Sequence, residues 1–414
     1  MRKLKVIIPI VLVCVFGGIG TAMYVISNSD KPIWNATKIY NCDEEVKSIG
    51  KFTAATAEEL LSKSENTCYS PVSLYTLVCF VAEKTNDSVA KEVVSGLGYK
   101  HYGASYKMKK GCESIIEKVT CVDEDANNIV QIGNSMWISN EKYDVTAEEM
   151  SDSDIDNVPM DIFVEDFSNE DIGVWMSEKT NQLISDVQVN DMSLGLVSTI
   201  RFEKTWHINF KENKKGEFTT ASGEKIQVEY MVGEEVSGYV SGKDYIAANM
   251  SYYGGTEMIV VLPDEDKNLA DLVDEDTINE IIASYTTTGF LGGEKEADVK
   301  FTIPKFSIET TFTTDKINDS LKNIGIDKVF DINSWNVAGD NEMSEIELIQ
   351  KTKFEIDEEG TVSEANGKPK FGSLGYGEKD RTNLDIVLNR PFMYIVMTDD
   401  IPLFIGTVYN PTEG

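Results

Sequence analysis

The residue types that most often perform catalysis are sparse in this chain. Only two of its 414 residues are histidines, His101 and His207. His101 lies in a turn rich in glycine and tyrosine, and His207 follows Trp206 in a run of strand-forming residues. A Ser-His-Asp triad would have to be assembled from distant residues, and no GxSxG motif marks a nucleophile. We therefore assign both histidines a structural role.

Chemistry that depends on a cofactor or a metal has no motif in the sequence. There is no Walker loop, no GxGxxG and no HExxH. Carboxylate pairs such as Glu358 and Glu359 follow from composition, because the formal net charge is −32. We predict that the protein is not an enzyme and uses no cofactor or metal.

The same charge argues against a nucleic-acid partner, which would require clustered lysine and arginine. It is compatible with a well-solvated surface or with the attraction of a basic partner. Five cysteines lie beyond the N-terminal segment, an odd number with no CxxC, which indicates neither a disulfide framework nor a zinc site. They are Cys42, Cys68, Cys79, Cys112 and Cys121.

The N-terminal segment indicates export. Positively charged residues at 1–5 precede an uncharged apolar run at 6–26, about as long as a bilayer is thick. Residues 1–29 are predicted to be either a cleaved signal peptide or a retained signal anchor. Residues 30–47 are predicted to be a spacer, so any membrane contact is expected through the N-terminal segment alone.

The most unusual stretch is a long polar, glycine-rich segment at 356–390, which lies between two apolar runs. Thr361, Ser363, Ala365 and Gly367 place a small uncharged side chain at every second position. A strand directs alternate side chains to opposite faces, so this segment can enter a sheet with small groups on one face. A mobile surface loop of ordinary composition is the other interpretation.

Periodic segments predict the elements that would hold this stretch. Ser70 is a good N-cap for a helix that begins at Pro71, and Asp87 is predicted to cap a shorter helix that ends at Gly96 or Gly98. Further helices are predicted at 52–63, 107–119 and 172–187, and strands at 128–139, 196–210, 218–231 and 245–263.

Several motifs together resemble the serpin family. They are IDEEGT at 356–361, NRPFMYIV at 389–396, PLFIGTVYNP at 402–411, and an Asn followed by Ser-Pro-x-Ser at Asn66, Ser70, Pro71 and Ser73. The resemblance extends from about Ser48 onward. It implies one α+β domain at 48–414, with a large mixed β-sheet, two further sheets, eight or nine helices and an exposed reactive-centre loop at about 360–389.

The resemblance also implies particular site residues. In the family, the segment before the exposed loop acts as a hinge, and a polar network lies where the strands of the large sheet part. Gln350 stands where the family has a histidine, which should remove pH sensitivity from that network. The hinge residues carried over are Glu358, Gly360, Thr361, Ser363 and Ala365, and the network residues are Asn66, Ser70, Ser73, Gln350 and Trp206.

The scissile bond remains ambiguous by counting. The usual spacing from the hinge gives Leu374–Gly375, whereas counting back from the C-terminal motif gives Asp380–Arg381 or Arg381–Thr382. Leu374 suits an apolar specificity pocket and Arg381 a trypsin-like one. An ordinary solvated loop charge is the other interpretation of Arg381.

The function implied by the resemblance is inhibition of an extracellular serine endopeptidase by suicide-substrate trapping, by a protein expected to be a monomer. A cysteine protease is the less favoured target. Pro369 lacks a backbone donor and interrupts a strand, and the family's alanine-rich hinge is replaced here. These departures favour the alternative, a non-inhibitory serpin that acts as a binding or structural protein.

Overall fold

The computed structural model describes residues 44–361 and 381–413, apart from gaps at 101–102, 124–127, 156–157, 188–191, 211, 287–294 and 336–345. The N-terminal segment, on which the signal and anchor predictions rest, lies outside the described residues. Within those residues, no helix has the length and apolar character needed to cross a membrane. The four described cysteines, Cys68, Cys79, Cys112 and Cys121, are free.

Eight α-helices occur in the described part of the chain. Serine and asparagine side chains begin two of them: Ser70 accepts a hydrogen bond from the Ser73 amide at the start of α2, and Asn86 accepts from the Ser88 and Val89 amides at the start of α3. The helices are α1 Glu44–Leu60, α2 Pro71–Lys84, α3 Asp87–Gly96, α4 Ala104–Val119, α5 Ala147–Ser151, α6 Asn169–Lys179, α7 Glu275–Thr286 and α8 Thr314–Asn323.

Several predicted boundaries are wrong or shifted. The cap of α3 is Asn86, because Asp87 is already its first helical residue. Helix α6 ends at Lys179, eight residues before the predicted end at 187, because Asn181 and Gln182 adopt left-handed φ values of 53° and 65° that break the helix. Helix α1 begins inside the predicted spacer. The predicted loop at 360–389 is too long, because residues 382–387 pair with a neighbouring strand as β14.

The sheet that bears on function has seven strands. Its main order is β11-β12-β5-β3-β2, with β4 paired to β3 and β13 paired to β5. The strands β12 and β5 are parallel neighbours, and β5 and β3 are antiparallel. The bounds are β2 Cys121–Asp123, β3 Asn128–Ile138, β4 Met160–Val164, β5 Leu194–Thr205, β11 Phe306–Phe312, β12 Ile346–Ile356 and β13 Gly360–Thr361.

Nine further strands form a continuous ladder that the long strand β7 divides into two sheets. Most of β7 pairs with β6 and β10, and only its last residues pair with β8. The predicted α+β fold with one large mixed sheet and two others is confirmed. The strands are β1 Thr67–Tyr69, β6 Glu212–Thr219, β7 Lys225–Ser241, β8 Tyr245–Ser251, β9 Thr256–Pro263, β10 Glu296–Pro304, β14 Thr382–Val387, β15 Phe392–Thr398 and β16 Ile401–Val408.

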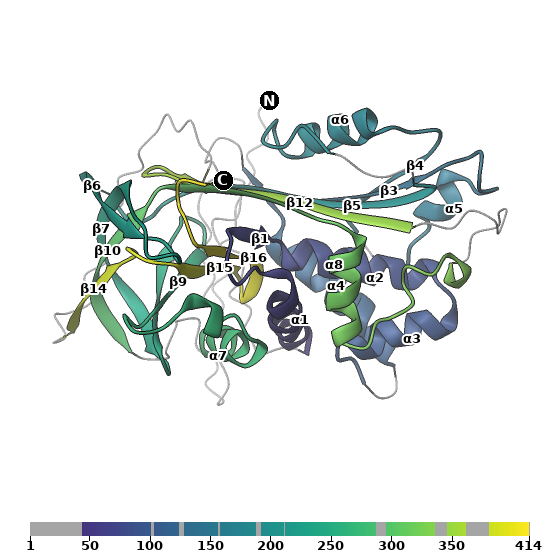
Figure 1. Ribbon diagram of the computed structural model, residues 1–414. Helices are drawn as coiled ribbons and strands as arrows, with labels where there is room; N and C mark the ends of the chain where they lie inside the picture. Colours follow the sequence, from purple (N-terminus) through teal and green to yellow (C-terminus); the bar gives the residue numbers. More distant parts are fainter. Residues whose placement is uncertain are drawn as a thin grey trace, which may run out of the picture. The chain divides into compact units, whose positions relative to one another are not determined.

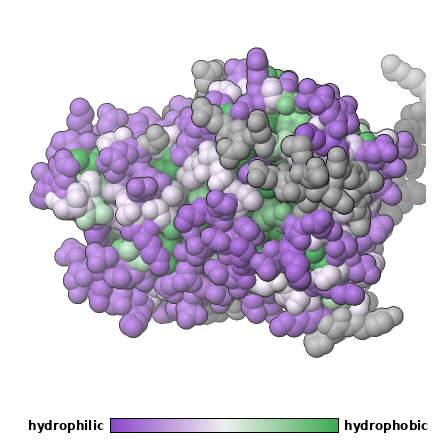
Figure 2. Space-filling model, turned by 45° about the vertical axis from the view of Figure 1, so that its right-hand side comes forward, coloured by the Kyte–Doolittle hydropathy of each residue, from purple (hydrophilic) through white to green (hydrophobic). Residues whose placement is uncertain are grey.

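The seven-stranded sheet is covered on both faces. Figure 1 shows α6 on one face and α2 on the other. A small apolar cluster that includes Trp137, Trp175 and Val197 joins α6 to the sheet, whereas the other face belongs to the large core of the unit. On the surface shown in Figure 2, hydrophilic side chains dominate and hydrophobic ones appear in small areas, as expected for a chain of charge −32.

Candidate functional site

The seven-stranded sheet is split between its two central strands. Residues Ile346–Gln350 of β12 pair with Leu194–Ser198 of β5, and the ladder between them stops there. Above Ser198, β5 remains paired to β3, and above Gln350, β12 remains paired to β11. In the described residues, nothing pairs with Thr199–Glu203 on the β12 side. We call the point where the strands part, at Ser198 and Gln350, the fork.

The side chain of Gln350 holds the fork from the core side. It is 1% exposed, accepts a hydrogen bond from the Ser70 amide at 3.1 Å, and donates to the Ser70 carbonyl at 3.0 Å and to Ser198 Oγ at 3.3 Å. Both ends of the amide are therefore used, which an amide allows because it donates and accepts. The predicted contact between Gln350 and the start of α2 is present.

Two serines and a threonine satisfy the next backbone groups above the fork. The hydroxyls of Ser70 and Ser73 are 2.9 Å apart, and Ser73 Oγ donates to the Thr199 carbonyl at 3.3 Å. Thr199 Oγ1 in turn donates to the Lys351 carbonyl at 3.0 Å, across the split. Side chains thus bond carbonyl groups that a further strand would otherwise engage.

The hinge has already started a strand at the open end of the split. Gly360 and Thr361 form β13, antiparallel to Thr205 and Lys204 at the end of β5. The approach is close, since a Cβ on Gly360 would lie 2.0 Å from the Lys204 carbonyl oxygen, and its φ is +154°. Only glycine fits this position.

A tight turn presents the hinge to the sheet. Asp357 Oδ1 accepts from the amides of Glu359 at 2.8 Å and Gly360 at 3.1 Å, and the Asp357 amide donates to the Gly360 carbonyl. Trp206 fastens the turn, because its backbone amide donates to the Glu359 carbonyl at 3.1 Å and its Nε1 donates to the Asp357 carbonyl at 2.8 Å.

Tyr252 fixes the last described hinge residue. Its ring stacks on Trp206 with centroids 3.9 Å apart, and its hydroxyl lies 2.8 Å from Thr361 Oγ1. Burial raises the pKa of Tyr252 well above its usual value, so the hydroxyl stays protonated. Glu358 is held by Lys305 at 2.5 Å, and the hydrogen bond from that ammonium lowers the pKa of Glu358.

Other predicted site residues lie elsewhere. Asn66 fastens the C-terminal tail instead of the fork: its Oδ1 accepts from the amides of Tyr409 and Asn410, and its Nδ2 donates to the Asn410 carbonyl at 2.6 Å. Trp206 acts on the hinge turn. The candidates Ser363, Ala365, Leu374, Gly375 and Asp380 lie outside the described residues.

Arg381 and Thr382 are described, and both are engaged by a sheet. Arg381 Nε lies 3.4 Å from Glu296 and its NH1 lies 3.6 Å from Asp298, with 17% of the side chain exposed. Thr382 is the first residue of β14, opposite Ala297. The chain has therefore joined the sheet at Thr382.

Sequence reasoning missed several residues of this site. Asp357 was identifiable from the sequence, because an aspartate side chain in a turn commonly accepts a hydrogen bond from the backbone amide two residues further on. Tyr252, Thr199 and Lys351 gave no local signal, because their roles depend on strand pairing. Lys351 is 5% exposed and its Nζ bonds Asp186, in the segment after α6, at 2.9 Å. It links β12 to the structure that covers the split.

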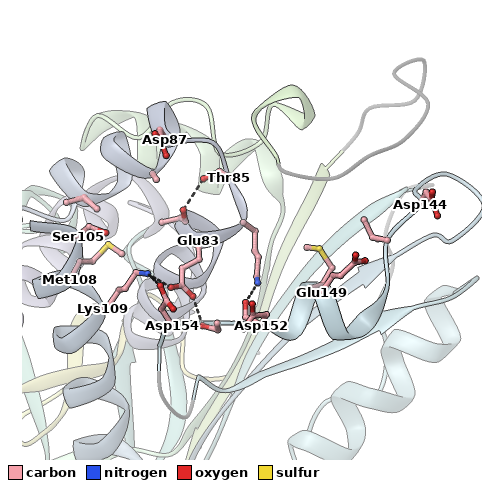
Figure 3. Close-up of a pocket in the computed structure, with 17 residues that line it drawn as sticks. Glu83, Thr85, Asp87, Ser105, Met108, Lys109, Asp144, Glu149, Asp152 and Asp154 are labelled. Atoms are coloured by element: carbon pink, nitrogen blue, oxygen red, sulfur yellow. Dashed lines mark hydrogen bonds and ion pairs between the residues drawn. The ribbon is translucent and has the colours of Figure 1, made fainter.

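A cavity of about 650 Å³ lies at the other end of α2, beyond Lys84 (Figure 3). Its cations are already engaged: Lys109 bonds Glu83 at 2.8 Å and Asp154 at 2.6 Å, and Lys84 donates to the Asp152 carbonyl. These bonds fasten α2 and α4 to the segment that follows α5, which is a structural role.

His207 is the histidine in the described part of the chain, and no described side chain forms a catalytic arrangement with it. Its side chain is 57% exposed, its Nδ1 lies 3.9 Å from Glu235, and that neighbouring carboxylate raises the pKa of His207. Across the described ranges, no three histidine, cysteine or acidic side chains form a group able to hold a metal.

Comparison with known proteins agrees with this arrangement. A family model described as Serpin (serine protease inhibitor) matches residues 47–411. The chain is 24% identical over 397 residues to Serpin-Z2B of Oryza sativa subsp. japonica, covering 85% of this chain and 93% of that protein. Among solved structures it is similar to the thermophilic serpin Tengpin in its native state, with a TM-score of 0.75, 21% identity and coverage of 90% and 96% of the two chains. Human thyroxine-binding globulin gives a TM-score of 0.72 at 19% identity, with coverage of 89% and 100%.

Proposed function

This chain belongs to the serpin family, and we propose that it is an extracellular inhibitor of serine endopeptidases that traps its target as a suicide substrate. The observation that carries the proposal is the hinge. Gly360 and Thr361 already pair with the end of β5, beside a split that has room for a further strand between β5 and β12. Within the described residues, the hinge is therefore paired at the open end of the split, where it is placed to continue into the sheet.

In the proposed mechanism a protease attacks the loop and forms an acyl-enzyme. The freed hinge then continues β13 down the split and carries the attached protease with it, which distorts the protease active site before deacylation. The chain supplies the scissile peptide bond but no catalytic group. Its contribution is the free energy gained when an exposed segment acquires ladder hydrogen bonds and buried contacts.

The pairing already present predicts how the strand would continue. In the two observed antiparallel pairs, each step forward along the hinge is one step back along β5. The same register would place Ser363 opposite Phe202 and Ala365 opposite Ile200. Phe202 and Ile200 face the large core. Because directly opposed residues share a face, the small hinge residues would lie against that core.

We propose Leu374–Gly375 as the scissile bond. Spacing from the hinge supports it, since Gly360 now has a defined place in the sheet. The bonds on either side of Arg381 are less suited to a protease cleft, because the guanidinium pairs with Glu296 and Asp298 and Thr382 is already in β14. An apolar residue at this position favours proteases with an apolar specificity pocket.

A non-inhibitory binding serpin is the second candidate, and Pro369 favours it. The same register would place Pro369 opposite Leu196, below the fork, where it lacks the amide that the ladder needs. The fold is shared by a serpin that binds thyroxine. If insertion slows at Pro369 until deacylation occurs, the protein is cleaved as a substrate.

The two functions are separated by a panel of elastase, chymotrypsin and trypsin. An SDS-resistant complex, together with a cleaved form that melts at a higher temperature than the intact form, supports inhibition. Cleavage without a complex and without a higher melting temperature supports the binding function and contradicts the proposed inhibition. A Pro369→Ala variant sharpens the comparison, because it restores an amide donor and should raise the fraction of protease trapped.

The target class and the location follow from the same proposal. A serine endopeptidase is the expected partner of a monomeric inhibitor, with a cysteine protease as the less favoured target. Export on the apolar run at 6–26 would place the protein outside the cell, either released or held by that segment. Fractionation of an epitope-tagged chain, followed by N-terminal sequencing, distinguishes release from anchoring.

A further inference from the structure

Lys204 is a buried lysine in an unusual position. It lies near the end of β5, directly opposite Thr361 of the hinge, and is only 2% exposed. Among the described residues, no carboxylate lies within ion-pair distance of its amine. A buried ammonium without a paired anion is costly, so such a group tends to lose its proton. Burial accordingly lowers the pKa of Lys204, against the opposing influence of Cys121 and Asp399.

The polar partner of Lys204 is the side chain of Asn128. The two residues are directly opposed in the antiparallel ladder of β3 and β5, and Lys204 Nζ contacts Asn128 Oδ1. The amide is confined on its other side, since a Cβ on Gly254 would lie 3.1 Å from Asn128 Oδ1. The amine therefore has a fixed neighbour that contains an electrophilic carbonyl carbon.

An amine held against an amide carbonyl is placed for acyl transfer, and a lowered pKa favours the neutral form that can attack. A desolvated lysine is a competent nucleophile, and a fixed geometry replaces the entropy cost of a bimolecular encounter.

We propose that Lys204 and Asn128 form an intramolecular isopeptide bond that covalently joins β5 to β3. The Lys204 amine attacks Asn128 Cγ, the bond from Cγ to Nδ2 breaks, and ammonia leaves. The proton on the attacking nitrogen passes to the departing one, so the amine and the amide are converted to a secondary amide and ammonia. No oxidant, reductant or added reagent is consumed.

Such a bond is compatible with strand insertion. The split lies between β5 and β12, on the opposite side of β5 from β3. The cross-link would keep β3 and β5 together as one body while the gap beside them fills. It would not bar the hinge, whose first pairs lie on the β12 side of β5.

The bond is tested by the mass of the purified full-length domain after reduction. Loss of ammonia lowers the intact mass by about 17 Da, and digestion should give one branched peptide that contains both Asn128 and Lys204, with no cleavage after Lys204. The branched peptide is essential, because cyclisation at Asn366–Gly367 would lower the mass by the same amount. An unbranched peptide at 204 in the folded wild-type protein overturns the proposal.

Two variants serve as matched tests. Lys204→Arg retains a hydrogen-bond donor without an attacking amine, and Asn128→Ala removes the carbonyl; neither should yield the branched peptide. Because the wild-type peptide decides the main question, a variant that fails to fold does not remove the test.

Discussion

Replacing Gly360 with alanine tests whether the hinge pairing seen here lies on the route to inhibition. The added Cβ would lie 2.0 Å from the Lys204 carbonyl, so the hinge must leave the end of β5. Three contacts are then lost: the pairs of Gly360 and Thr361 with β5, and the bond from Thr361 Oγ1 to the Tyr252 hydroxyl. At about 1 kcal/mol net for each hydrogen bond, the paired state loses about 3 kcal/mol, roughly a 100-fold fall in its population.

The assay is the stoichiometry of inhibition, meaning the number of inhibitor molecules consumed for each protease molecule trapped. Gly360→Ala should raise it and shift the products from SDS-resistant complex to cleaved inhibitor, because a slower start lets deacylation win. Gly325→Ala is the matched control: its φ is +82°, but no atom lies within 4 Å of the added Cβ. It should cost about 1 kcal/mol of backbone strain with no change in stoichiometry. Wild-type stoichiometry in Gly360→Ala would refute the role given to β13.

Three further variants probe the site and its surroundings. Tyr252→Phe removes only the bond to Thr361 and should lower the free energy of unfolding by about 1 kcal/mol, with a smaller rise in stoichiometry; an effect as large as that of Gly360→Ala would contradict this. Gln350→His should make stability depend on pH, because protonation of a buried imidazole is disfavoured and its pKa is lowered in the folded state. The folded state then loses stability as the pH falls through that lowered pKa. A difference in melting temperature from wild type that is constant between pH 5 and 8 would count against this prediction. Burial and the charge of Glu235 raise the pKa of Glu257 to about 7, so the unfolded chain binds fewer protons and stability falls as the pH rises from about 4.5 to 7. Glu257→Gln should therefore raise the free energy of unfolding at pH 8 by up to about 3 kcal/mol, with a higher melting temperature. Both quantities should change little at pH 4.5.

The family and the α+β fold were predictable because their signals are local in the sequence. Ser70 and Pro71 define the start of α2, and the apolar runs that form β15 and β16 carry two of the family motifs. Element ends were less predictable. The end of α6 is set by two residues with positive φ, and neither asparagine nor glutamine at those positions prevents a helix by its type alone.

The candidate site was predictable only where a motif contained the whole interaction. Gly360 and Thr361 were identified from the hinge motif, and Gln350 from its spacing to that motif. The partners of these residues come from other strands: Thr199 and Tyr252 act through cross-sheet contacts that no window of sequence reveals. Asn66 was wrongly placed in the network at the fork: its motif is intact, but its hydrogen bonds reach the C-terminal tail.

The arrangement at the fork explains how a folded sheet can remain ready to accept another strand. An open pair of strands normally exposes unpaired backbone groups, which are costly when buried. Here side chains bond two of those groups, through Ser73 to the Thr199 carbonyl and through Thr199 Oγ1 to the Lys351 carbonyl. These bonds make the split state stable enough to persist, but each is a single side-chain contact. An inserted strand would replace them with a continuous ladder on both sides. The difference between the two sets of bonds contributes to the free energy that a cleaved hinge could release.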